Sequence, residues 1–326
     1  MSARLAGTAV LVALSLPMCN AAAQEQVPAA PAQAPSAPAP AAVPEFPKPN
    51  PANFTATSPT KEVINAFLQS TWGFDENRMW QVQGIMKTPV EGVSKVVIIV
   101  GDKTGKQKFS AVGFFVMPDG KHIIAGDEIL PFGEHPYADD RALLQEKADG
   151  PYRGSAMKDL ELVEFADFEC PHCKEAEANM DKLAVDFPKA RIVFQNYPLT
   201  RIHPAAETAA SYGVCVDKLG GSTAFFQFAS AVFEGQEGLV TPDGATLTLN
   251  SAVTKAGLDP AKVATCAATP AVAAEVESSV KLAQDLNINQ TPTLMVNGRL
   301  VPIGGVPYET IKKIVEYQAK LDGVSQ

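Results

Sequence analysis

The sequence predicts an α/β protein with a long helical insert, and three observations carry this prediction. Residues 160–165 (LELVEF) are apolar enough for a buried strand, and residues 174–187 then repeat apolar side chains at helical spacing. Residues 191–197 (RIVFQNY) read as a second strand. Helical patterns then dominate residues 203–288 before the strand signals return. We therefore expect a helical domain inserted into an α/β unit that spans residues 151–326.

Glycine and proline residues interrupt the expected insert and divide it into separate helices. The pattern predicts helices over 204–218, 223–233, 249–256, 260–265 and 271–286. Strands follow over 293–296 and 299–303, and Asn297-Gly298 between them is a typical hairpin turn. A last helix is expected over 308–321.

A smaller α+β domain is expected before this unit, over residues 59–150. A helix is predicted over 60–70 and a connecting helix over 139–148. Strand-like runs occupy 93–100, 109–117 and 122–125. Pro118-Asp119-Gly120 supplies the turn between the last two runs, because proline fixes φ and glycine accepts a positive φ.

The first 58 residues indicate export followed by a spacer. Arg4 precedes an apolar run too short to span a membrane, and Ala21-Ala22-Ala23 resembles a cleavage site, so residues 1–23 are expected to be a signal peptide. Cleavage would remove Cys19; the alternative, a lipid-modified Cys19 anchoring the chain to a membrane, is less favoured because Met18 precedes it. Residues 24–58 are rich in Ala and Pro and are expected to be a disordered linker. The expected location is periplasmic or secreted.

The charge of the chain argues against nucleic acid as a partner. The 326 residues carry a formal net charge of −9, and no basic stripe is present.

Four cysteines remain after the expected cleavage. Cys170 and Cys173 form a C-x-x-C motif, and exported proteins commonly pair their cysteines. Pairing these two leaves Cys215 with Cys266, for which we expect a structural disulfide. The alternative is that Cys215 and Cys266 are buried free thiols that fill space in helices.

The motif Cys170-Pro171-His172-Cys173 lies at the expected start of a helix. Unpaired N–H groups and the helix dipole favour a thiolate there, so Cys170 is the expected nucleophile and the more interior Cys173 the resolving thiol. Pro171 at the first helical position costs no hydrogen bond.

The neighbouring polar residues are open to more than one interpretation. His172 is expected to stabilise the thiolate, with a solvent-facing spacer as the alternative. Asp167 and Glu169 would oppose thiolate formation if they lay near the sulfur. His203 is expected to be a capping or surface residue rather than a catalytic one.

Strand, C-x-x-C helix, strand and a later strand introduced by Thr291-Pro292 follow the order of the thioredoxin fold. With Thr291-Pro292-Thr293 and Gly304-Gly305 also in order, and a helical insert of about 203–288, the chain resembles the DsbA-like thiol–disulfide oxidoreductases. A lone C-x-x-C also occurs in zinc sites, but no second close ligand pair accompanies this one, so no metal and no cofactor are expected.

The resemblance implies roles for three further residues. Glu164 holds the position of a buried acid beneath the cysteines, where a raised pKa would let it shuttle the proton of Cys173; an exposed strand position is the alternative. Pro292 is implied to be cis and to pack against the disulfide, with an ordinary trans turn as the alternative. The backbone of Thr291 is implied to pair with an extended substrate chain.

The smaller domain carries a looser resemblance. Residues 114–127 (FFVMPDGKHIIAGD) resemble part of the N-terminal dimerisation domain of the periplasmic disulfide isomerases, so a homodimer is an alternative to a monomer.

Three functions are compatible with these observations. The favoured hypothesis is an exported thiol–disulfide oxidoreductase that inserts disulfides into cysteine-containing exported proteins and is reoxidised by an unidentified redox partner. The second hypothesis is a dimeric isomerase or reductase. The third, from another class, is a chaperone-like binding module in which the cysteines are only a staple.

Overall fold

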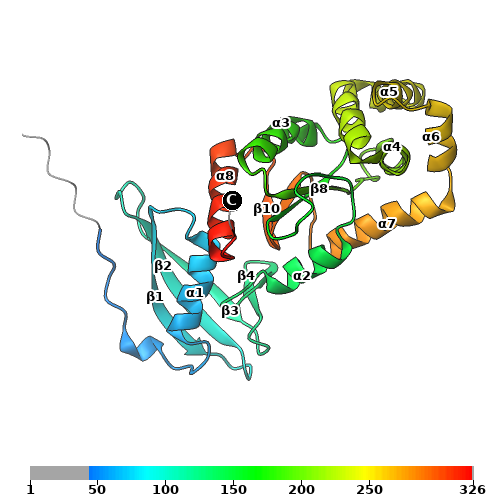
Figure 1. Cartoon of the computed structure of the whole chain (residues 1–326). Coiled ribbons are helices and arrows are strands. Elements are labelled where there is room, and N and C mark those ends of the chain that lie inside the picture. The colour runs from blue at the N-terminus through cyan, green and yellow to red at the C-terminus, as the bar shows by residue number, and fades with distance from the viewer. Residues whose placement is uncertain (1–43, 325–326) are drawn as a thin grey trace, which may run out of the picture. The chain divides into compact units, whose positions relative to one another are not determined.

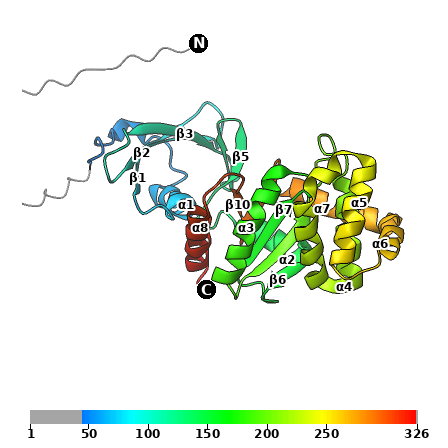
Figure 2. The ribbon, with the colours of Figure 1, turned by 90° about the horizontal axis from the view of Figure 1, so that it is seen from above.

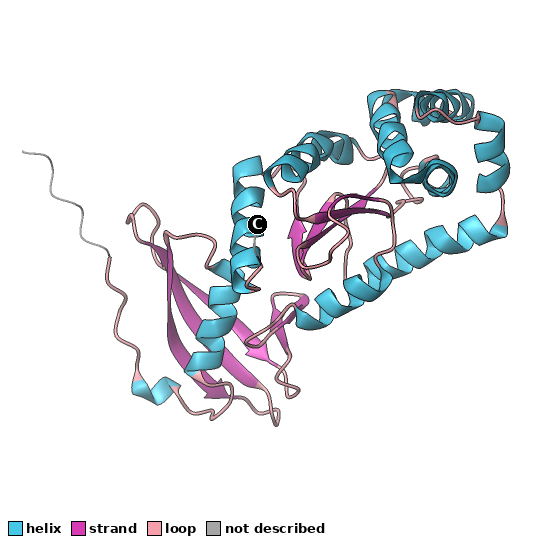
Figure 3. Cartoon of the chain, in the orientation of Figure 1, coloured by secondary structure: helices cyan, strands magenta, loops and turns pink. Residues whose placement is uncertain are grey.

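The computed structural model describes residues 44–324, and its strands form two separate five-stranded sheets (Figure 3). The first sheet is antiparallel throughout and has the order β1-β2-β3-β4-β5. Its strands are β1 (Arg78–Lys87), β2 (Ser94–Asp102), β3 (Ser110–Val116), β4 (His122–Ala125) and β5 (Glu128–Pro131). The sequence analysis found β2, β3 and β4 but missed β1 and β5.

Helix α1 (Lys61–Trp72) covers one face of this sheet. It begins at Thr60, whose side chain accepts a hydrogen bond from the N–H of Val63. Its buried residues Ile64, Phe67 and Leu68 share one apolar cluster with side chains of β1 to β4. The helix thus closes one side of a small hydrophobic core whose other side is the sheet.

The end of the expected linker belongs to this folded part, which corrects the prediction for residues 44–58. Phe46 packs against Phe109 with ring centroids 4.7 Å apart, and the 3-10 helix η1 (Pro51–Asn53) follows. The N–H groups of Thr55 and Ala56 both donate to the carbonyl of Ile85. The Pro-rich composition predicted a disordered linker, but aromatic and backbone contacts hold the segment on the sheet. The expected signal peptide (1–23) and the rest of the linker (24–43) lie outside the described residues.

The second sheet has the order β10-β9-β7-β8-β6. Its strands are β6 (Tyr152–Gly154), β7 (Glu161–Ala166), β8 (Arg191–Asn196), β9 (Thr293–Val296) and β10 (Arg299–Pro302). The central pair β7 and β8 is parallel, whereas β9, β10 and β6 join in antiparallel fashion. A parallel pair needs a crossover connection, and α3 (Pro171–Asp186) provides it.

Two pairs of helices cover the faces of this sheet (Figures 1 and 2). On one face, α3 and α8 (Tyr308–Leu321) pack residues such as Met180 and Ile311 against Leu162 and Leu294. On the other face, α2 (Ala138–Lys147) and α7 (Pro270–Asp285) contribute Leu144 and Leu282. Every residue of β7 is buried, as expected of a central strand covered on both sides.

The remaining helices form the insert between β8 and β9. They are α4 (Ala206–Glu234), the 3-10 helix η2 (Gln236–Val240), α5 (Pro242–Lys255) and α6 (Pro260–Ala267), and they lead into α7. The two helices predicted before residue 234 are joined in α4, which is interrupted at Gly221 with φ 74° and ψ 177°. The predicted α/β class, a thioredoxin fold with a helical insert, is confirmed.

Within residues 44–324, no helix combines the length and the apolar character that crossing a membrane requires.

Candidate active site

The two cysteines of the motif lie where strand β7 leads into helix α3. Cys170 is the N-cap residue of α3, Pro171 is its first residue, and Cys173 lies one turn into it. Both are free thiols; Cys170 keeps 6% of its surface exposed and Cys173 none. A substrate can therefore reach only Cys170 without a change in structure.

The surroundings of Cys170 stabilise its thiolate. A hydrogen bond from the Cys173 thiol is the main cause that lowers the pKa of Cys170 to about 5, and burial opposes it. A contact with Thr291 and the backbone N–H groups of His172 and Cys173 lower this pKa further. Cys170 is thus ionised at neutral pH.

Cys173 has the opposite character. Burial raises the pKa of the Cys173 thiol, and the hydrogen bond to Cys170 and the charge of Cys170 raise it further. The N–H of Asp167 lies 3.4 Å from the Cys173 sulfur and partly offsets this effect. Cys173 therefore stays protonated while its neighbour is a thiolate.

His172 turns its ring toward solvent and toward Glu175. The Nδ1 atom lies 3.1 Å from Oε2 of Glu175, and this hydrogen bond is the main cause that raises the pKa of His172. The charge of Cys170 raises it as well. His172 therefore contributes its backbone N–H and a through-space attraction to the site, while the Nδ1 atom of its ring is hydrogen-bonded to Glu175.

Glu164 is buried in β7, so the alternative of an exposed strand position is wrong. Only 2% of its surface is exposed to solvent. Burial raises the pKa of Glu164 to about 8, and the charge of Glu177 raises it further. Arg153 acts in the opposite direction and forms ion pairs with Glu177 at 3.3 Å and with Asp181 at 2.6 Å. Glu164 in turn raises the pKa of Cys173, which places the carboxyl within electrostatic reach of that thiol.

The two acids that precede Cys170 point to the helical insert. Oδ2 of Asp167 accepts hydrogen bonds from the N–H of Leu199 at 2.7 Å and from Nδ1 of His203 at 2.8 Å. Oε2 of Glu169 accepts from the N–H of Ala205 at 2.8 Å. Neither acid is among the groups that shift the pKa of Cys170, so the expected opposition to the thiolate does not arise.

The Thr291–Pro292 peptide bond is cis and lies beside the cysteines. The Cys170 sulfur is 3.7 Å from the carbonyl oxygen of Thr291. Gly304 lies close by, since a Cβ built there would be 3.6 Å from Cδ of Pro292 and 3.9 Å from Cβ of His172. The structure thus brings Cys170, His172, Thr291 and Pro292 to one place.

Cys215 and Cys266 are joined by a disulfide between α4 and α6, with an S–S distance of 2.04 Å. They are not free thiols, so that alternative does not hold.

Two contributors to the site escaped the sequence analysis. His203 is half-buried and pairs with the buried Asp167 rather than being a surface or capping residue, and Gln236 donates to the backbone carbonyls of Phe168 and Cys170. These contacts join residues 36 and 66 to 68 positions apart, and no local pattern signals them.

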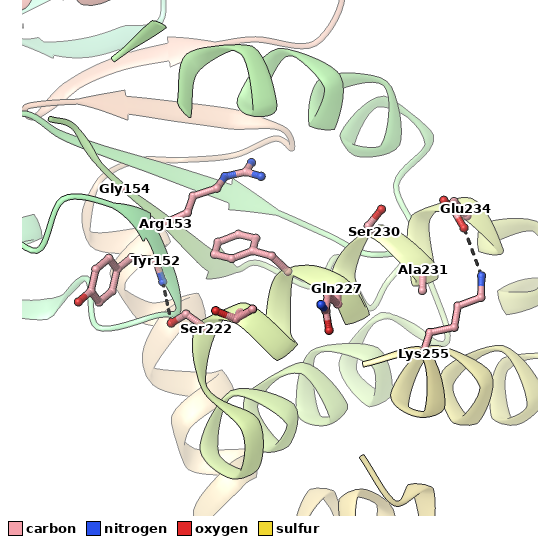
Figure 4. Close-up of a pocket in the computed structure, with 11 residues that line it drawn as sticks. Tyr152, Arg153, Gly154, Ser222, Gln227, Ser230, Ala231, Glu234 and Lys255 are labelled. Carbon is pink, nitrogen blue, oxygen red and sulfur yellow. Dashed lines mark hydrogen bonds and ion pairs between the residues drawn. The ribbon is translucent and has the colours of Figure 1, made fainter. Parts of the chain in front are cut away.

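A pocket of about 730 Å³ lies between β6, α4 and α5 (Figure 4). Arg153 lines it and stacks on Phe226 at 4.7 Å, while Glu234 and Lys255 form an ion pair at its other end. None of the cysteines lines this pocket. Among residues 44–324, no group of three or more His, Cys, Asp or Glu side chains is arranged to hold a metal ion.

Comparison with known proteins places this site in a family. Residues 146–317 match the family model described as thioredoxin. Among relatives, a Na(+)/H(+) antiporter NhaA 3 from Salinispora tropica is 31% identical over 147 residues, 45% of this chain and 21% of that protein. Disulfide bond formation protein D from Bacillus subtilis is 26% identical over 175 residues, 52% of this chain and 77% of that protein. The chain thus spans about a fifth of the length of the antiporter it matches.

Solved structures with similar chains include a thioredoxin-like oxidoreductase from Silicibacter pomeroyi. It is 26% identical, covers 55% of this chain and 98% of its own, and has a TM-score of 0.47. Oxidised BdbD from Bacillus subtilis is 25% identical, covers 52% and 93%, and has a TM-score of 0.45.

Proposed function

We propose a function from the premise that the chain belongs to the thioredoxin family: Cys170 and Cys173 exchange disulfides with cysteine-containing exported proteins. The observation that carries the proposal is the contrast between an ionised Cys170 and a buried, protonated Cys173 one helical turn away. We further propose that the pair acts as a dithiol oxidase, because a stabilised thiolate is a good leaving group and favours the reduced form of the enzyme.

The oxidising reaction proceeds through two exchanges. A substrate thiolate attacks Sγ of Cys170 in the Cys170–Cys173 disulfide, a mixed disulfide forms, and the Cys173 sulfur leaves and takes up a proton. A second substrate thiolate then attacks the substrate sulfur of that mixed disulfide, and Cys170 leaves as a thiolate. The substrate gains a disulfide, and the enzyme gains two electrons, which it passes to a redox partner.

The surrounding residues support these steps. Glu164 is the group we assign to supply the proton for Cys173, since its raised pKa keeps it protonated near neutral pH. The backbone beside cis-Pro292 is the surface we assign to an extended substrate segment, because the Thr291 carbonyl lies against the Cys170 sulfur.

An equilibrium titration of the Cys170–Cys173 pair against glutathione tests the proposal. An oxidase is expected to have a potential above about −180 mV, whereas a value near about −270 mV is typical of a reductant. A variant with both cysteines replaced by serine is the control and should not titrate. A wild-type pair that does not exchange with glutathione, and whose Cys170 resists alkylation, would instead support the binding-module hypothesis.

The isomerase alternative predicts a second property. Residues 114–127 resemble part of the dimerisation domain of disulfide isomerases, so we expect an isomerase to form a dimer, and sedimentation of the chain distinguishes the two hypotheses. We propose the oxidase; a stable homodimer that restores a protein with scrambled disulfides would favour the isomerase.

A further inference from the structure

The segment that leads into the nucleophile, residues 167–170, is attached to the helical insert by its side chains and by its carbonyls. Asp167 and Glu169 accept hydrogen bonds from residues 199–205, as described above. Phe168 is 1% exposed and packs against Phe228 and Phe233 of α4, with ring centroids 5.7 and 5.4 Å apart. Each residue before Cys170 thus has a partner in the insert.

Gln236 completes this attachment at the nucleophile itself. It is the first residue of η2 and keeps 8% of its surface exposed. Its Nε2 atom donates to the carbonyl of Phe168 and to the carbonyl of Cys170, both at 2.9 Å. One buried amide therefore donates to two backbone carbonyls, one before Glu169 and one at the nucleophile Cys170.

We propose that Gln236 is a positioning residue that lets the helical insert set the backbone geometry of Cys170. The inference rests on the proposed exchange function, since it assigns Gln236 a role at that site.

The physical reason is the geometry at the N-cap. The Cys170 carbonyl also accepts from the N–H of Cys173 at 3.1 Å and of Lys174 at 3.3 Å, which starts helix α3. A third donor from Gln236 fixes the plane of this peptide unit. The N–H groups of His172 and Cys173 can then face the Cys170 sulfur and stabilise its thiolate.

The position of Gln236 is itself well anchored. Phe233, near the end of α4, and Leu239 of η2 are buried in the apolar cluster that contains Phe168 and both cysteines of the motif. The N–H of Gly238 donates to the carbonyl of Gly235 at 2.9 Å. The amide therefore projects from a rigid support, as positioning requires.

The experiment compares Gln236→Met with wild-type protein, both reduced at the motif. Methionine keeps the length of the side chain and removes the donors. We expect the pH midpoint of thiolate formation at Cys170, followed by ultraviolet absorbance, to rise by about one pH unit, and alkylation at pH 5 to slow about fivefold. Gln227→Met, an exposed position on α4, is the matched control and should leave both readouts unchanged.

A second variant separates positioning from folding. Gln236→Asn keeps an amide that is too short to reach both carbonyls, and it should raise the midpoint in the same direction. An unchanged midpoint in Gln236→Met, whatever its melting temperature, would overturn the proposal. Failure of both variants to fold would do the same, because the side chain would then be required for folding.

The readout does not depend on the proposed activity. Thiolate titration and alkylation need only the reduced protein and a small alkylating reagent. A wild-type chain that fails to exchange with glutathione would remove the proposed function, whereas an unmoved midpoint would remove only the role of Gln236.

Discussion

At the scale of single residues, the site depends on an unequal division of one proton between two thiols. Cys173 is fully buried and donates to Cys170, which keeps a small exposed surface beside the N-terminus of α3. Burial penalises a charge on Cys173, and the helix N–H groups favour a charge on Cys170. The difference in pKa follows from placement, since the two side chains are chemically identical.

Removing the Cys173 thiol should therefore weaken the Cys170 thiolate. We expect Cys173→Ala to raise the pKa of Cys170, because its main stabilising hydrogen bond is lost, and to slow alkylation at pH 5 several-fold. Cys173→Ser keeps a hydroxyl donor and should have a smaller effect. Identical pH profiles for alanine, serine and wild-type proteins would show that this hydrogen bond does not control the pKa.

Glu164 should make stability depend on pH. Its pKa is about 8 in the folded protein and about 4.3 when unfolded, so between these values the folded state binds more protons and stability falls as the pH rises. Glu164→Gln mimics the neutral form. It should leave stability at pH 4 unchanged and increase it at pH 8 by several kcal/mol, up to about 5 for the full difference between the two pKa values.

Thermal unfolding of the oxidised protein at the two pH values measures this effect. The exposed Glu277→Gln is the control and should show no difference. A Glu164→Gln protein that is less stable than wild type at pH 8 would contradict the assignment of a costly buried charge. The same variant should slow proton transfer to Cys173 during exchange.

At the scale of elements, the helical insert is held together by its own disulfide and holds the segment before Cys170. Cys215 in α4 and Cys266 in α6 are 51 positions apart and lie in or against the same apolar cluster as the active-site cysteines. The disulfide is thus part of the support for Phe168 and Gln236.

Loss of this disulfide should lower stability substantially. We expect the Cys215→Ala/Cys266→Ala double variant to lose about 4 kcal/mol of unfolding free energy, because the unfolded chain gains the freedom of a loop of about 50 residues. Denaturant unfolding measures the loss, and wild-type protein in strong reductant should approach the variant. Equal midpoints for variant and oxidised wild type would rule out a stabilising bridge.

At the scale of the whole described chain, Arg299 of β10 joins the second sheet to the end of α1. Only 6% of the surface of Arg299 is exposed to solvent. Its guanidinium donates to the carbonyls of Ser70 at 3.1 Å and Thr71 at 2.5 Å. It also lies over the ring of Phe74 at 5.1 Å. These carbonyls end a helix and would otherwise lack partners within it.

Replacing Arg299 should loosen this connection. Arg299→Met leaves both carbonyls without the guanidinium, and we expect a loss of about 2 kcal/mol together with faster proteolysis within residues 44–137. Arg299→Lys, which cannot donate in a fork, should be intermediate. The exposed Arg201→Met is the control, and wild-type protease resistance in Arg299→Met would contradict the role.

Local patterns predicted most elements of the second sheet and its helices. Helices α3 and α8 follow the apolar periodicity of their sequences, and strand β7 follows a short, mostly apolar run. Strand β1 was missed because glutamines and methionines interrupt its apolar pattern, and β5 because only Ile129 and Leu130 stand between Glu128 and Pro131. The ordered segment 44–58 was missed because its high proline content predicts disorder. The residues that hold it in place, Phe109 and Ile85, lie far away in the sequence.

The sequence by itself determined the redox couple and the family of the fold. A C-x-x-C motif at a strand-to-helix junction needs only local geometry, as does the turn at Asn297-Gly298, where Gly298 has a φ of 88°. Tertiary structure decided what surrounds that couple. It buries Glu164 and Cys173. It also forms the hydrogen bonds of Asp167 and Glu169 with the insert and of Gln236 with the carbonyl of Cys170. These features depend on contacts between residues far apart in the chain, and burial and long-range hydrogen bonds have no periodic signal in sequence.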